Sequence, residues 1–141
     1  MQTKERLQEA ALQFGKTLRS LEVARSIKLQ ALDVAVADAV ESGIIRKFEI
    51  TVELFWKTSK IFLEHKDGIV EKTPKSVTKS LYLNEYIDET LYLGLTKAIN
   101  DLNEMSHIYK HEAYSKILED MVFHIKNLRQ IFELLESEIN G

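Results

Sequence analysis

Cysteine is absent from the 141 residues, so disulfide bonds and thiolate chemistry are excluded. The single proline and five glycines are few, which favours long regular elements over a turn-rich β fold. No stretch approaches the roughly 18 consecutive apolar residues that a membrane-spanning helix needs. The first ten residues, MQTKERLQEA, are charged and typical of a helix rather than of a signal peptide. We therefore expect a cytoplasmic protein without a membrane segment.

Sequence signatures of nucleotide-handling loops are also missing. Neither GxxxxGK[ST] nor GxGxxG occurs, the GxSxG of serine hydrolases is absent, and no Gly-Ser is followed by the paired aspartates of a nucleotidyltransferase. The net charge of −3 and a pI near 5.8 give no overall basic surface for nucleic acid. No cofactor or metal is predicted, and a binding protein is favoured over an enzyme.

The length and the 45% hydrophobic content predict one folded domain, residues 1–141. Its centre is the stretch 43–64, GIIRKFEITVELFWKTSKIFLE, which we interpret as an amphipathic helix capped by Ser42. At about 100° per residue, one broad apolar face collects most of its large side chains. A second, narrower apolar line is predicted to contact another subunit and consists of Ile50, Leu54 and Ile61.

Further helices are predicted on both sides of this stretch. Apolar spacing indicates helices over residues 4–25, 74–83, 84–103 and 112–138, the last with an unbroken heptad seam. Residues 26–40 fit a helical extension or a short turn, and residues 65–73 a loop ended by Thr73 and Pro74, which begin a new helix. The predicted fold is all-α, a four- to five-helix up-and-down antiparallel bundle.

Polar residues at the junction of two predicted helices are candidates for a ligand site. Asn103, His107 and Tyr109 fall there, where a histidine can act as a general base or bind phosphate. His107 and His111 with Glu104 or Glu112 have metal-ligand spacing, but solvated side chains at a helix start are the better interpretation. His124 borders the apolar seam of the last helix, and we expect it to be buried and hydrogen-bonded.

The central helix carries a row of charges, Glu49, Glu53 and Lys57, at intervals of four residues. On a helix surface such opposite charges contribute a few tenths of a kcal/mol per pair. Glu49 is predicted to lie near Trp56 and to need a partner, for which Arg46, Lys60 or the His107 side of the bundle are the candidates.

Two separated motifs together resemble the nucleotidyltransferase substrate-binding proteins. The central stretch is similar to that family's Arg-x-Phe-Glu-x-x-x-Glu-x-x-Trp-Lys helix, with Lys47 beside Phe48 and matches at Glu49, Glu53, Trp56 and Lys57. The stretch NEMSHIYKHEAY resembles the family's Arg-Asn-x-x-Ser-His-x-Tyr segment, with Asn103, Ser106, His107, Tyr109 and Ala113 in register. The resemblance covers roughly residues 5 to 138.

The resemblance implies a helical bundle of the HEPN class that forms a homodimer or higher homo-oligomer. It also implies a separately encoded minimal nucleotidyltransferase as partner, and such pairs include toxin–antitoxin modules. The ribonuclease activity of some members is attributed to an Arg-x4–6-His motif, whose Arg position here is Leu102. This departure removes the cation that would stabilise the transition state, so binding of nucleotide or substrate is favoured.

The sequence therefore predicts a non-catalytic subunit that binds nucleotide or RNA. Its ligand or partner cleft would contain Asn103, Ser106, His107 and Tyr109, supported from the central helix by a second group, Arg46, Glu49, Glu53, Trp56 and Lys57. Two alternatives stay open at this point: a HEPN-type ribonuclease toxin that uses His107, and a plain helical adaptor.

Overall fold

Helices make up nearly all of the computed structural model, which describes residues 3–105 and 110–141, with the backbone alone for residues 110, 111 and 113. Within these residues there are no strands, and the predicted all-α bundle is confirmed. The α-helices are α1 (Thr3–Arg25), α2 (Val34–Asp67), α3 (Pro74–Leu83), α4 (Glu89–Glu104), α5 (Lys110–Glu119) and α6 (Met121–Asn140), with a short 3₁₀ helix, η1 (Leu29–Ala31), before α2. None of the described helices has the length and apolarity to cross a membrane.

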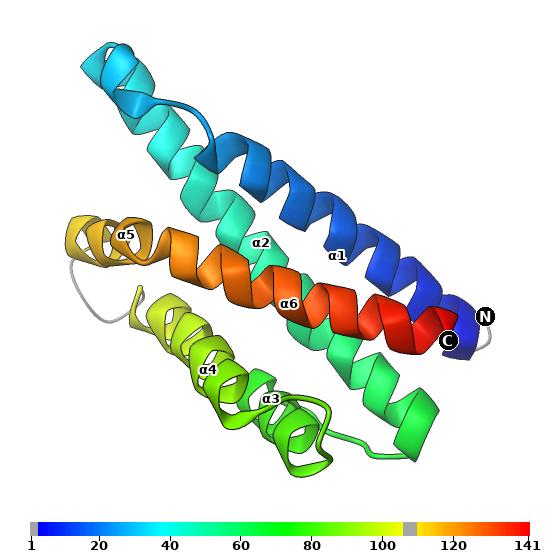
Figure 1. Cartoon of the computed structure of the whole chain (residues 1–141). Coiled ribbons are helices and arrows are strands. Elements are labelled where there is room, and N and C mark those ends of the chain that lie inside the picture. Colours follow the sequence, from blue (N-terminus) through cyan, green and yellow to red (C-terminus); the bar gives the residue numbers. More distant parts are fainter. Residues whose placement is uncertain (1–2, 106–109) are drawn as a thin grey trace.

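The two longest helices, α1 and α2, form an antiparallel pair that makes the most extensive contact in the fold (Figure 1). Helix α6 packs along this pair, while α3 and α4 pack on the other side of α2 and α6. The predicted broad face of the central helix is buried, apart from the half-buried Trp56. The centre of the core is aromatic and contains Phe14, Phe48, Phe55 and Phe62.

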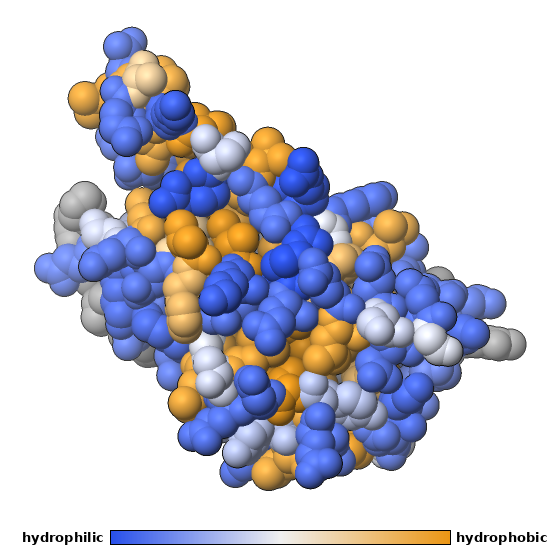
Figure 2. Space-filling model, viewed as in Figure 1, coloured by the Kyte–Doolittle hydropathy of each residue, from blue (hydrophilic) through white to orange (hydrophobic). Residues whose placement is uncertain are grey.

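The start of α2 is the first difference from the sequence prediction. We expected the helix to begin at Ser42 and Gly43, but it begins at Val34 and passes through both residues without interruption. The alanine-rich stretch before Ser42 favours helix strongly enough to outweigh one glycine. This first part of α2 projects beyond the bundle and exposes apolar side chains, among them Val34 and Val36 (Figures 1 and 2).

The boundaries of α2 and α3 follow the predicted signals. Gly68 ends α2 in the left-handed conformation, with a φ of 67° that glycine adopts without strain. Thr73 caps α3 through a reciprocal capping box with Ser76, and Pro74 occupies the first turn. Both observations agree with the loop and restart expected between the two helices.

Helix α4 begins later than predicted, at Glu89 instead of residue 84. The Asn84 side chain bonds the Ser80 carbonyl oxygen at 2.8 Å, and Glu85 adopts a left-handed φ of 64°. Asp88 then caps α4, because its Oδ1 accepts the Leu91 amide at 2.8 Å. The two predicted helices are thus separated by a turn with its own side-chain caps, which apolar spacing alone does not indicate.

The predicted continuous helix over residues 112–138 is also divided, at Asp120. This residue departs from helical geometry with a φ of −93° and a ψ of 5°, and its carboxylate accepts a hydrogen bond from Lys97. Three residues of the predicted heptad seam, Ile125, Phe132 and Ile139, are half-buried and pack against the core. The described core of α6 consists of Met121, His124, Asn127, Leu128, Ile131 and Leu135.

We predict opposite effects for two glycine-to-alanine substitutions in helices. Gly43→Ala should raise the free energy of unfolding by about 1 kcal/mol, because a Cβ there meets nothing within 4 Å and alanine favours helix. Gly94→Ala should lower it, because its Cβ would lie 2.3 Å from Nδ2 of the buried Asn127. Chemical denaturation measures both, and stabilisation by Gly94→Ala would contradict the packing described here.

Candidate functional site

A groove between α2 and α4 brings together residues from both sequence motifs. Arg46, Glu49, Glu53 and Trp56 line it from α2, and Asn103 lines it from the end of α4. The volume of the groove is about 440 Å³, within the usual range of small-molecule sites. Its remaining lining is largely apolar: Ile50, Val52, Leu54, Pro74, Ile99 and Leu102.

Charged pairs on α2 fix the rim of this groove. Arg46 donates to Glu49 at 3.4 Å, so Arg46 is the partner found for Glu49, whereas Lys60 pairs with Glu64 at 2.7 Å. Glu53 accepts bonds from Lys57 at 2.8 Å and from the Trp56 indole at 3.0 Å. These bonds, the one from Lys57 foremost, lower the pKa of the Glu53 carboxyl.

The structure thus places the predicted supporting residues of α2 on one helix edge. Four of them border the groove, while Lys57 does not line it and acts on it through Glu53. Asn103, which belongs to the predicted cleft, borders the same groove. The other predicted cleft residues, Ser106, His107 and Tyr109, lie outside the described residues, as does the side chain of His111.

Next to the groove, the end of α4 carries a buried carboxylate that sequence reasoning missed. The Asp101 side chain is only 2% exposed, and it contacts Lys97 Nζ at 3.1 Å, His124 Nε2 at 2.8 Å and Lys116 Nζ at 3.5 Å. These partners come from α4, α6 and α5 respectively. The pairs Lys97–Asp101 and Asp120–His124 each have a spacing of four residues, which was the available signal in the sequence.

His124 is fully buried and hydrogen-bonded, as expected from its place beside the apolar seam. Its ring stacks on Phe48 with the centroids 5.0 Å apart, and its Nδ1 has no hydrogen-bond partner in the described part of the chain. A neutral imidazole that donates its Nε2 proton to Asp101 accounts for both observations. Burial lowers the pKa of His124, although the bond to Asp101 opposes this effect.

Asp101, Asp120 and His124 are also arranged so that one ligand atom from each lies within 4.8 Å of the others. However, the Lys97 ammonium already bonds both carboxylates, at 3.1 Å and 2.7 Å. Burial lowers the pKa of Lys97, but its bonds to Asp120 and Asp101 outweigh this effect and raise it. The Lys97 ammonium therefore already compensates negative charge on the two carboxylates, and we assign no metal to the cluster.

We predict that His124 makes stability depend on pH. Because its folded pKa is lowered, the unfolded chain takes up the proton first as the pH falls. The free energy of unfolding should be constant above about pH 6.5 and decrease below it, by at most about 1.4 kcal/mol per pH unit. The pKa of Asp120 is lowered by its bond to Lys97, so its contribution is lost only at more acidic pH.

The matched variant is His124→Gln, which keeps an amide donor but does not titrate in this range. Denaturation curves between about pH 5 and 8 should show a smaller pH dependence for the variant than for the wild type. Equal slopes for the two proteins would contradict a buried neutral histidine at this position.

Comparison with known proteins supports the family assignment over nearly the whole chain. No curated protein matches the sequence significantly. A solved structure from Thermus thermophilus shares the fold, with a TM-score of 0.70 and 18% identity over 91% of this chain and 99% of that chain. A sequence model of the family described as "nucleotidyltransferase substrate binding protein like" matches residues 5–137. The chain therefore belongs to the nucleotidyltransferase substrate-binding protein-like family.

Proposed function

We propose that this protein is a non-catalytic subunit that binds the substrate of a separately encoded minimal nucleotidyltransferase. The observation that carries the proposal is the groove, because residues of two motifs that are far apart in the sequence border it together. Family membership supports the same role. Operation within a toxin–antitoxin module is part of the proposal and rests on the resemblance of the two motifs alone.

The chemistry of the groove suits a nucleotide. The Arg46 side chain is 69% exposed, and its ion pair among the described residues is a long one, 3.4 Å to Glu49, so its guanidinium can also pair with a phosphate. Trp56 offers an aromatic surface for a base, and its indole is held in place by the bond to Glu53. Asn103 contributes an amide from the opposite helix.

The apolar line on α2 supports the proposed assembly. Ile50 and Leu54 are half-buried and line the groove, and Ile61 is half-buried about two turns further along α2. Apolar side chains beside a ligand groove suit a protein contact, so we propose that this line forms the homodimer or receives the nucleotidyltransferase. In either arrangement the second chain would complete one wall of the groove.

The ribonuclease alternative has less support. Leu102 occupies the position of the arginine in the Arg-x4–6-His motif, and it lies half-buried in the groove wall. A leucine at this position cannot supply the cation that the motif places shortly before its histidine, and Arg46 reaches the groove from α2 instead. An adaptor without a ligand is the alternative that the following experiment distinguishes.

The proposal is tested by exchanging the charge at the groove. Arg46→Glu should weaken co-elution with a co-expressed minimal nucleotidyltransferase. It should also reduce the ATP-induced rise in melting temperature, as expected for an increase of at least about tenfold in the Kd of ATP. The control Arg6→Glu makes the same charge change on the exposed surface of α1 and should behave as wild type. Sedimentation of the chain alone should give twice the 16.3 kDa of one chain.

Two results would contradict this function. If the wild type neither co-elutes with the transferase nor responds to ATP, the subunit role fails. If Arg46→Glu and Arg6→Glu both bind as the wild type does, the groove between α2 and α4 is not the site.

A further inference from the structure

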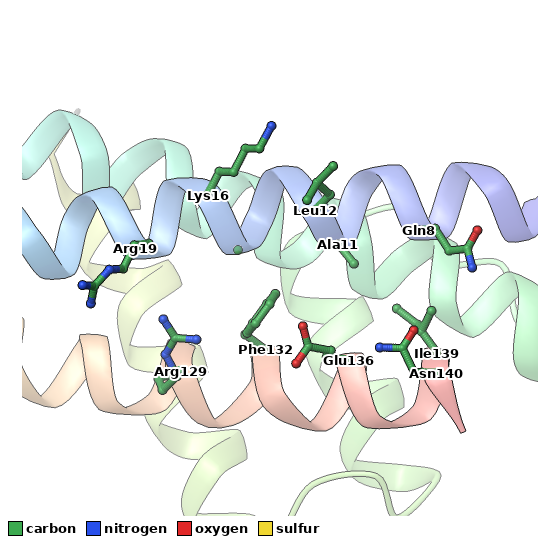
Figure 3. Close-up of a pocket in the computed structure, with 11 residues that line it drawn as sticks. Gln8, Ala11, Leu12, Lys16, Arg19, Arg129, Phe132, Glu136, Ile139 and Asn140 are labelled. Atoms are coloured by element: carbon green, nitrogen blue, oxygen red, sulfur yellow. The ribbon is translucent and has the colours of Figure 1, made fainter.

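A second groove lies between α1 and α6 and shares no residue with the first. Its volume is about 540 Å³. Figure 3 shows side chains from both helices pointing into it. The residues that characterise it are Ala11, Gly15 and Arg19 of α1 and Arg129, Phe132 and Glu136 of α6.

The middle of this groove is an aromatic surface in a fixed orientation. Phe132 packs edge-on against the buried Phe14, with ring centroids 5.4 Å apart and an angle of 87° between the planes. Gly15 lies directly opposite, and a Cβ there would be 2.9 Å from two atoms of the Phe132 ring. The absence of a side chain at Gly15 therefore allows α1 to approach the ring closely.

Positive charge gathers at one end of the groove. Arg129 is held by Glu22 of α1, with its Nε 3.1 Å from Oε2, and its guanidinium lies 5.3 Å from the Phe132 ring centroid. Arg19 extends from α1 toward the same gap and makes no ion pair with any described residue (Figure 3). Because Glu22 neutralises Arg129, the guanidinium of Arg19 carries the uncompensated positive charge at this end of the apolar groove, and this charge is complementary to an anion.

Further along α6 the character of the groove changes. Glu136 lies beyond Phe132, on the side away from the two arginines, and it is followed by Ile139 and Asn140 (Figure 3). A carboxylate here disfavours a second negative group and accepts a hydrogen bond from a neutral donor. The groove thus has one end for an anion and one for a polar, uncharged group.

We propose that the α1–α6 groove binds a small organic anion with a flat apolar body and a single negative group. The anion pairs with Arg19, beside the Glu22-bound Arg129, and the body lies over Phe132 between Ala11 and Ile139. This site is independent of the proposed nucleotide groove, because the two have no lining residue in common.

The test uses two fluorescent probes with the same apolar body. The anionic probe is 8-anilinonaphthalene-1-sulfonate, and the neutral control is N-phenyl-1-naphthylamine, which lacks the sulfonate. The folded wild type should bind one anionic probe per chain and bind the neutral probe more weakly. Arg19→Gln should raise the Kd of the anionic probe about fivefold or more and leave that of the neutral probe unchanged.

Two further variants separate the groove from other surfaces. Ala11→Trp should fill the groove and abolish binding of both probes, whereas Arg6→Gln, an equal loss of charge elsewhere on α1, should change nothing. Circular dichroism and sedimentation of each variant should match the wild type.

Several outcomes would overturn the proposal. They are equal binding of the two probes by the wild type, unchanged binding of the anionic probe by both Arg19→Gln and Ala11→Trp, and no binding at all. A change from dimer to monomer in Ala11→Trp would also overturn it, because the groove would then be a subunit contact.

Discussion

The bundle depends on the burial of one carboxylate, that of Asp101. A charge in the core without a partner is strongly unfavourable, because it loses its hydration without compensation. Asp101 avoids the cost because Lys97, Lys116 and His124 meet it from α4, α5 and α6. The three helices are therefore held together at the position of Asp101.

This constraint extends from the core to the proposed site. Asp101 holds the end of α4 against α5 and α6 through its contacts with Lys116 and His124. Asn103 follows shortly after Asp101 and borders the groove beside α2. His124 connects the same cluster to α2 by stacking on Phe48, whose neighbour Glu49 lines the groove. The core ion pairs and the candidate site are thus parts of one packed unit.

Much of the fold follows from local patterns in the sequence. Apolar spacing located α1 and the buried face of α2, and Thr73, Pro74 and Gly68 marked helix boundaries, because each signal acts within a few residues. The start of α2, the turn before α4 and the break at Asp120 were not predicted. At Asp120 the contact with Lys97 joins two different helices, and apolar spacing along one helix carries no information about such a contact.

For the candidate site too, the sequence predicted some features and not others. The charged residues of α2 and Asn103 were selected from their positions in the sequence and then by resemblance, but only the structure shows which of them border one groove. The partners of Asp101 and the α1–α6 groove depend on contacts between helices far apart in the chain, which apolar periodicity does not report. The sequence therefore predicted residues of the candidate site but not the shape of the groove that they border.

Hydrogen–deuterium exchange with and without the nucleotidyltransferase tests the central claim most directly, because it reports which backbone amides a partner covers or stabilises. We expect added protection in peptides that span residues 46–57 and 99–103, with little change in α1. Protection confined to α1 and α6, or no protection in a mixture that contains both chains, would contradict the account.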